Sequence, residues 1–242
     1  MAASRTIEAW ALDKFVAKHL EALVPEVTPG DYRSAMYMLG YEIANQYLES
    51  AVTEKRLHVV TVVEDFDNVA SGVMDRFKVG GKEVSYSCLW PQFRVLLENP
   101  RVEVSPIYQA YDQPEPGVPY EIVVVAANVG SVTTLRSCLI HTVMDHGFNG
   151  SRSYNILSPA VHTEAADRLE ASLPREMRNR TRWFPLARDQ ELSGDGFTLP
   201  GVGGDPIRLA GFTDRREREH YLPMAIRLDF DERQDLSRNH DL

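Results

Sequence analysis

The sequence predicts an α/β fold in which helices flank a largely parallel sheet. The chain has 242 residues, of which 43% are hydrophobic, so it can bury a sizeable core. Residues 57–63 and 121–127 are almost continuously apolar runs of strand length, which is typical of parallel strands buried on both faces. Segments with helical periodicity alternate with such strands, and this alternation favours a parallel sheet.

The expected elements follow one another in a regular order. Residues 6–27 and 31–49 carry apolar side chains at helical spacing, with a turn and helix cap at Thr28-Pro29-Gly30-Asp31 between them. Further along, the pattern predicts strands at 57–63, 102–108, 121–127, 154–157 and 183–186, helices at about 132–146 and 161–173, a Pro-rich loop at 109–119, an edge strand at 221–230 and ten polar residues at the end.

Composition narrows the possible functions. The formal net charge is −9, whereas binding of nucleic-acid phosphates needs clustered Lys and Arg. The first residues lack a secretory signal pattern, and no apolar run approaches the roughly 20 residues of a membrane helix. Cys88 and Cys138 have no CxxC spacing and are typical of reduced core thiols. We therefore expect a cytoplasmic protein that binds neither nucleic acid nor a membrane.

Carboxylates follow the first buried strand. In open α/β sheets, ligands bind beyond the carboxyl ends of the strands, and Glu64, Asp65 and Asp67 come directly after residues 57–63. Asp65 and Asp67 are candidate ligands of Mg²⁺, which prefers oxygen donors, although the cluster could equally recognise a cationic substrate group or form a solvated loop. Because close carboxylates shift each other's pKa, all three are candidate catalytic acids or bases.

A second candidate site follows the strand at 121–127. Asn128, Gly130 and Ser131 open the helix predicted after it. Backbone N–H groups at a helix N-terminus bind phosphate, but a serine at this position is also an ordinary helix cap. Both interpretations stay open.

A third motif lies near the end of the chain. Asp189-Gln190-Glu191-Leu192 leads into Gly196-Phe197-Thr198-Leu199-Pro200-Gly201-Val202-Gly203-Gly204-Asp205. This stretch resembles the base-binding signature of the uracil phosphoribosyltransferase family, and residues 57–77, 122–132 and 155–165 resemble other segments of that family in the same order.

The resemblance implies a particular organisation and set of contacts. It implies one phosphoribosyltransferase-type domain over residues 1–212, with a small hood at about 181–212 that carries the base-binding loop, followed by a charged extension over 213–242. It also implies a homodimer or larger homo-oligomer that binds a small molecule. The residues that it implies for substrate binding are Asn128, Gly130, Ser131, Asp189, Phe197, Gly201, Gly203 and Asp205.

Several residues that the resemblance makes important differ in this chain. Glu64 stands where the family has a diphosphate-binding arginine, Val123 where it has a ribose-binding acid, and Val129 where it has a cradle glycine. The loss of each such contact typically costs orders of magnitude in rate, so efficient UMP synthesis is not expected.

We therefore expect a repurposed enzyme of this family that acts on a different small molecule. One version uses a metal-bound organic diphosphate and Mg²⁺ in a cyclisation or transfer reaction, as in bacterial specialised metabolism. Two alternatives stay open, namely an active uracil phosphoribosyltransferase that makes UMP from uracil and phosphoribosyl diphosphate, and a non-catalytic ligand sensor or partner subunit.

Overall fold

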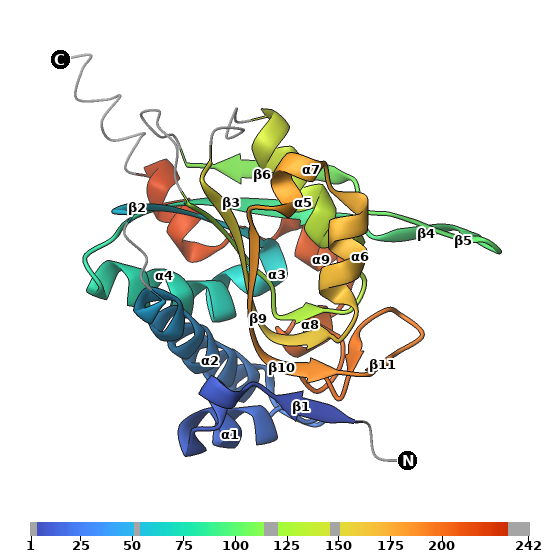
Figure 1. The fold of residues 1–242 in the computed structure, drawn as a ribbon, viewed down its shortest axis with the longest axis horizontal. Helices are drawn as coiled ribbons and strands as arrows, with labels where there is room; N and C mark the ends of the chain where they lie inside the picture. Colours follow the sequence, from blue (N-terminus) through green and yellow to red (C-terminus); the bar gives the residue numbers. More distant parts are fainter. Residues whose placement is uncertain (1–3, 51–53, 114–120, 146–150, 232–242) are drawn as a thin grey trace.

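A mixed β-sheet forms the centre of the molecule (Figure 1) in the computed structural model, which describes residues 4–50, 54–113, 121–145 and 151–231. Its strands follow the order β1-β10-β9-β7-β2-β3-β6, and β8 pairs with β9. Neighbours from β10 to β3 are parallel, while the edge strands β1 and β6 run antiparallel to them. The strands of this sheet are β1 (Arg5–Ile7), β2 (Arg56–Val62), β3 (Glu83–Pro91), β6 (Ile107–Asp112), β7 (Glu121–Val125), β8 (Asn128–Val129), β9 (Ser153–His162) and β10 (Thr181–Asp189).

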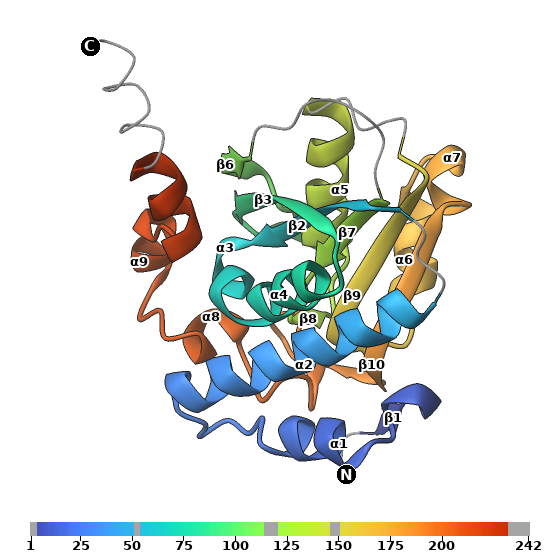
Figure 2. The same ribbon diagram turned by 90° about the vertical axis from the view of Figure 1, so that its left-hand side faces the viewer.

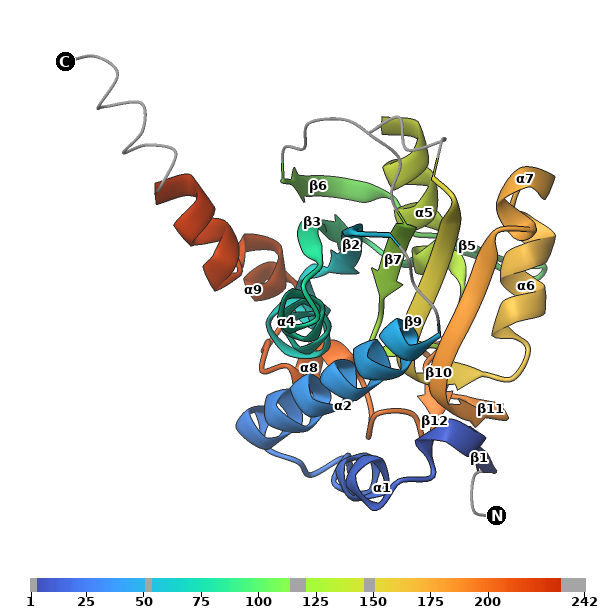
Figure 3. The same ribbon diagram turned by 60° about the vertical axis from the view of Figure 1, so that its left-hand side comes forward.

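Helices cover both faces of this sheet, as Figures 2 and 3 show. On one face lie α2 (Pro29–Glu49) and α4 (Ser71–Val79), and on the other α5 (Thr133–Asp145), α6 (Ala165–Ser172) and the short α7 (Arg175–Arg178). Val123 of β7 enters the first core and Val124 the second, as the two-residue period of a strand requires. The predicted α/β fold, with a largely parallel sheet between helices, is confirmed. Within the described residues, no helix combines the length and apolar character needed to span a membrane.

The first predicted helix, 6–27, is wrong in its N-terminal half. β1 pairs there with β10, a short 3-10 turn follows, and α1 (Lys14–Glu21) begins only after Asp13. The Arg5 guanidinium binds the Asp189 carboxylate at 2.7 Å, so a partner far along the chain holds this segment as a strand. The second helix is confirmed, since α2 begins after Thr28, whose hydroxyl accepts a hydrogen bond from the Asp31 N–H at 3.2 Å.

The strand predictions need three corrections. The predicted strand 102–108 is two strands, because β5 (Arg101–Val104) forms a separate hairpin with β4 (Arg94–Glu98) while β6 joins the main sheet. The sequence pattern misses β3, whose buried Ser85 and Ser87 interrupt its apolar residues and hydrogen-bond His58. β9 continues to His162, beyond the predicted 154–157, so the next helix begins at Ala165 and not at residue 161.

The C-terminal part of the chain folds back onto the core. The hood contains β11 (Glu191–Leu192), β12 (Thr198–Leu199) and α8 (Pro206–Leu209), and α9 (Arg215–His220) follows it. Residues 224–231 are helical, so the edge strand predicted at 221–230 is wrong. Tertiary packing explains the difference, because the helical conformation of this segment buries Ile226 completely in the core. The predicted Pro-rich loop at 109–119 is wrong over residues 109–112, which belong to β6 and pair with β3. The rest of that loop from residue 114, the end of the helix at 132–146 and the last ten residues lie outside the described residues.

Candidate functional site

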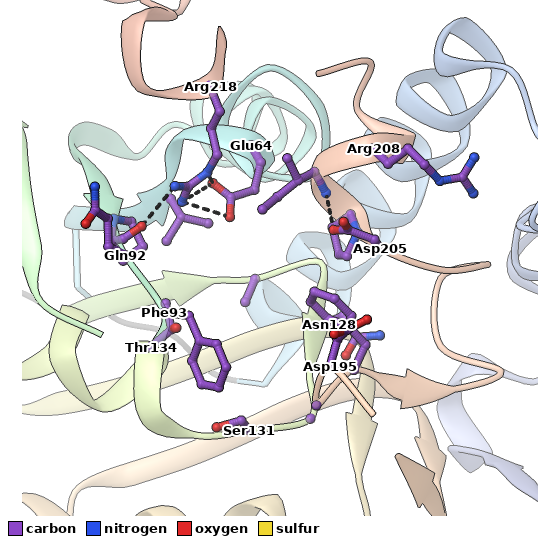
Figure 4. A pocket seen from close by; sticks show the side chains of 18 of the residues that line it. Glu64, Gln92, Phe93, Asn128, Ser131, Thr134, Asp195, Asp205, Arg208 and Arg218 are labelled. Atoms are coloured by element: carbon purple, nitrogen blue, oxygen red, sulfur yellow. Dashed lines mark hydrogen bonds and ion pairs between the residues drawn. The ribbon is translucent and has the colours of Figure 1, made fainter. Parts of the chain in front are cut away.

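The strand order of the sheet reverses between β2 and β7. The chain passes from β2 to β3 on one side, whereas β7 pairs with the other side of β2 and continues to β9. Ligands bind at such switch points in open α/β sheets. A cavity of about 860 Å³ lies there, bounded by the ends of β2 and β7, the β4–β5 hairpin, the hood and α9 (Figure 4). The position of the pocket therefore follows from the topology.

Glu64, the first predicted carboxylate, is held by an arginine from the C-terminal segment. The Arg218 Nε and Nη2 donate to the two oxygens of Glu64 at 2.8 and 3.1 Å, and Nη1 donates to the Pro91 carbonyl at 2.9 Å. The two side chains are only 6% and 12% exposed. The fork geometry and the burial make this a strong, charge-assisted pair on the cavity wall.

Asp65 connects the ends of the two strands that flank the switch point. Its Oδ2 accepts a hydrogen bond from the Ala127 N–H, just beyond β7, at 2.9 Å. The other oxygen, Oδ1, is buried and has no hydrogen-bond partner among the described residues. Burial, reinforced by the neighbouring Glu64 carboxylate, raises the pKa of Asp65 to about 8. Burial and Glu64 therefore favour the protonated form of Asp65, which lines the cavity.

Asp67 has different partners from Asp65, although Glu64 lines the cavity of each. Its Oδ2 accepts a hydrogen bond from the Tyr221 hydroxyl, and it lines a smaller cavity of about 360 Å³ together with Arg33. Among the described residues, no group of three or more His, Cys, Asp or Glu side chains could hold a metal ion. Because Glu64, Asp65 and Asp67 have three different sets of partners, they do not fit a shared Mg²⁺ in this arrangement.

The N-terminus of α5, the predicted phosphate site, carries a carboxylate of this chain. Glu103 of β5 accepts hydrogen bonds from the hydroxyls of Ser131 at 2.6 Å and Thr133 at 3.0 Å, while the Ser131 hydroxyl accepts one from the Thr133 N–H at 3.3 Å. Burial raises the pKa of Glu103, but hydrogen bonds from Ser131, Arg101 and Thr133 outweigh it and lower that pKa overall. Ser131 therefore serves as a helix cap that holds Glu103.

Asn128 and Gly130 attach the hood to the β7–α5 loop. The Asn128 amide donates to the Thr198 hydroxyl at 2.9 Å and accepts from the Thr198 N–H at 3.0 Å. At Gly130, a Cβ atom would lie 2.0 Å from the Gly196 carbonyl oxygen, so only glycine allows this approach. Both residues also line the cavity, so they position its wall as well as face its interior.

Three residues of the C-terminal motif support the hood without lining the cavity, namely Asp189, Gly201 and Gly203. Asp189 is fully buried, pairs with Arg5, and accepts a hydrogen bond from the Gly201 N–H at 2.9 Å. Gly201 and Gly203 adopt φ angles of 58° and 91°, which favour glycine. The motif thus shapes the loop, and its direct contribution to the cavity comes from Gly196, Phe197 and Asp205.

Asp205 and two arginines of the cavity wall also have internal partners. Asp205 caps α8 by accepting a hydrogen bond from the Ile207 N–H at 2.9 Å. Arg208 donates to the Pro25 carbonyl at 3.1 Å, and its guanidinium points away from the other labelled residues in Figure 4. Arg101 pairs with Glu103 at 2.7 Å.

Sequence reasoning misses Arg218, Glu103 and Phe93. Arg218 falls in the mixed-charge run 214–219, and Glu103 in a predicted strand, where neither carries a recognisable motif. Phe93 follows β3, which the sequence pattern does not predict, and its ring lies below the Glu64–Arg218 pair in the view of Figure 4. The available signal was the charged run itself, since strongly charged segments also supply partners for buried carboxylates.

Comparison with known proteins gives likeness at the level of fold. No protein-family model matches the sequence, and no curated protein matches it. The structure of the AQ2163 protein from Aquifex aeolicus is similar over 83% of this chain and 96% of that one, with 16% identity and a TM-score of 0.61. At this identity, the similarity shows a shared fold and assigns no function.

Two other solved structures are similar more loosely. A hypothetical protein from Neisseria gonorrhoeae with bound ppGpp shares 11% identity over 65% of this chain and 80% of that one, with a TM-score of 0.44. The hypoxanthine-guanine phosphoribosyltransferase of L. donovani shares 15% identity over 69% and 82%, with a TM-score of 0.34. TM-scores of this size establish neither a fold nor a substrate, and neither of these two structures is identified as a uracil phosphoribosyltransferase.

Proposed function

We propose that the chain is an enzyme of phosphoribosyltransferase ancestry that acts on a small molecule bound at the switch point, with Asp65 as its proton donor and acceptor. The ancestry is supported by the ordered sequence motifs and by a sheet of the doubly wound type. The observation that carries the catalytic part is Asp65. It is buried, lines the cavity, and has one oxygen engaged by Ala127 and the other without a partner.

The geometry of Asp65 determines the form of its chemistry. Because Oδ2 accepts the Ala127 N–H, the proton of the neutral acid resides on Oδ1. A carboxyl with a pKa of about 8 lies close to ambient pH, where proton transfer in both directions is efficient. Glu64, fixed by Arg218, supplies the negative charge that helps to keep Asp65 protonated. Acid–base catalysis on a bound small molecule is the reaction class that these groups support.

A metabolite-consumption assay tests this proposal. A metabolite extract is incubated with the wild-type protein, with Asp65→Asn and with Asp75→Asn, and then analysed by mass spectrometry. Asp75 is a matched control because it is a partly buried carboxylate on α4, outside the cavity, that accepts a hydrogen bond from Tyr37. We expect a metabolite that wild type and Asp75→Asn consume and Asp65→Asn does not.

The alternatives give different results. Robust UMP formation from uracil, phosphoribosyl diphosphate and Mg²⁺ would indicate a divergent uracil phosphoribosyltransferase. A metabolite that binds the protein and is never consumed would indicate a ligand sensor. The homo-oligomer that the family resemblance implies is a separate prediction, which sedimentation of the full chain would test.

A further inference from the structure

The cavity contains two elements that could bind an anionic group of a ligand. One is the N-terminus of α5, where Ser131 and Thr134 line the cavity and Thr133 lies between them, and the other is the guanidinium of Arg218. Both are suited to phosphate, because a helix N-terminus and an arginine fork each stabilise negative charge. The partners of these two elements therefore decide which ligands the cavity accepts.

The α5 N-terminus is already occupied by the chain itself. The Glu103 carboxylate accepts both hydroxyl hydrogen bonds, at 2.6 Å from Ser131 and 3.0 Å from Thr133. Gly196 O accepts the Ser131 N–H at 2.9 Å. A phosphate at this place would have to displace Glu103 and lose these hydrogen bonds, or else sit beside a negative charge.

Arg218 is occupied in the same way. Each of its three guanidinium nitrogens donates to an oxygen of the chain, two of them to Glu64 and one to the Pro91 carbonyl. At 5% exposure, the residue is buried, so a ligand anion could reach it only by separating a buried ion pair. The second anion-binding element is therefore closed by a second internal carboxylate.

The other charged side chains of the cavity wall also disfavour an anionic ligand. Among the residues that the structure describes, the wall contains seven carboxylates and four guanidinium groups, and no lysine or histidine. Of the other guanidinium groups, Arg101 pairs with Glu103, Arg94 donates to Gln92, and Arg208 points away toward Pro25. A phosphorylated ligand would therefore enter a cavity whose wall has more carboxylates than guanidinium groups.

We propose that Glu103 and Glu64 occupy the two anion-binding positions of the cavity, so that its ligand is a cationic or uncharged organic molecule without phosphate. This inference rests on the proposed function in that it names the substrate class of the same site. It also excludes the organic diphosphate that the sequence suggested as a substrate.

Titration with inorganic pyrophosphate tests the role of Glu103. We expect that calorimetry detects no saturable binding to the wild-type protein at millimolar pyrophosphate. In Glu103→Ala, the Ser131 and Thr133 hydroxyls and the α5 N-terminus become free, so pyrophosphate affinity should rise at least about tenfold. Saturable binding by the wild type would overturn the proposal, and so would a folded Glu103→Ala variant with no gain.

Glu98→Ala is the matched control. Glu98 lies on the same hairpin, lines the same cavity and also pairs with Arg101, but it does not contact α5. Glu98→Ala changes the net charge by the same amount as Glu103→Ala, and it should leave pyrophosphate binding undetectable. Circular dichroism checks that Glu103→Ala is folded. If it is not, Glu103→Gln keeps the size of the side chain and removes the charge, and the same gain is expected.

The test separates this inference from the proposed function, because the titration measures binding without turnover. If the metabolite assay identifies a phosphorylated substrate that depends on Asp65, the inference about ligand class fails and the enzymatic role stands. If pyrophosphate behaves as expected but no metabolite is consumed, the inference about the cavity stands and the enzymatic role fails.

Discussion

Carboxylates that are close in sequence do not share an environment when the backbone turns between them. Asp65 ends the short helix α3 (Val63–Asp65), and Asp67 lies in the π-helical turn Phe66–Ala70 that follows. Near 3.6 residues per turn, side chains two positions apart point to opposite sides. Asp65 therefore meets Ala127 while Asp67 meets Tyr221, and a cluster in the sequence becomes two separate sites.

The buried Asp65 carboxyl makes stability depend on pH. Burial and Glu64 raise its pKa from 3.8 to about 8, so between these values the folded state holds a proton that the unfolded state has released. The stabilisation is fully present below pH 3.8 and is lost as pH rises through about 8. Asp65→Asn is permanently neutral, and at alkaline pH it should be more stable than wild type by several kcal/mol, since each unit of pKa shift corresponds to about 1.4 kcal/mol.

Urea unfolding at a series of pH values across this window measures the effect. The wild type and the Asp75→Asn control should lose unfolding free energy as pH rises, while Asp65→Asn should lose less. Parallel curves for wild type and Asp65→Asn would show that Asp65 is already ionised in the folded state.

At the scale of elements, the cavity wall depends on the contact between the hood and the β7–α5 loop. Gly196 O accepts the Ser131 N–H at 2.9 Å, and the close approach of the two backbones leaves no room for a side chain at Gly130. Asn128 adds two hydrogen bonds to Thr198 of β12. The hood is thus fixed to the N-terminus of α5, although more than sixty residues separate them.

Gly130→Ala should loosen this contact. Its Cβ would lie 2.0 Å from the Gly196 carbonyl oxygen, so one of the two backbones must move, at a cost of roughly 1–3 kcal/mol. Gly194→Ala is the control in the same hood, because a Cβ there meets no atom within 4 Å. Thermal unfolding compares the two variants. Equal melting temperatures would mean that the hood and the loop are not in close contact.

At the scale of the whole molecule, residues 213–231 of the segment predicted as a charged extension pack against the rest of the chain. Arg218 and Tyr221 reach Glu64 and Asp67, which precede each of them by 154 residues. Asp229 accepts hydrogen bonds from Tyr86 at 2.5 Å and Tyr111 at 2.8 Å. The described part of the segment therefore completes the cavity wall and covers the edge of the sheet near β3 and β6.

The Arg218–Glu64 pair should contribute measurably to the free energy of unfolding. Arg218→Met leaves a buried carboxylate without its partner and should cost about 3 kcal/mol in urea unfolding. Arg216→Met, at an exposed position on the same helix, should change stability by less than about 0.5 kcal/mol. The double variant Glu64→Met with Arg218→Met should recover part of the loss, because no charge is then left unpaired. Equal losses in the single and double variants would contradict this account.

The sequence by itself determined the class of fold and the place of the cavity. Apolar runs buried on both faces identify β2 and β7, and the residues after them, from Glu64 and from Asn128, must lie at one edge of a parallel sheet. These signals are local in the chain, since burial acts on consecutive side chains. The same local reasoning fails at β1 and at residues 224–231, where distant partners override the apolar pattern.

Only the tertiary structure decided what the candidate residues do. Whether Ser131 binds a phosphate or caps a helix depends on Glu103, and whether Glu64 binds a metal or an arginine depends on Arg218. Asp189 belongs to the most recognisable motif and yet pairs with Arg5 behind the hood. The physical reason is that a charge acquires its role from the charges and donors that folding brings within hydrogen-bond distance, and these come from parts of the chain that no local pattern connects.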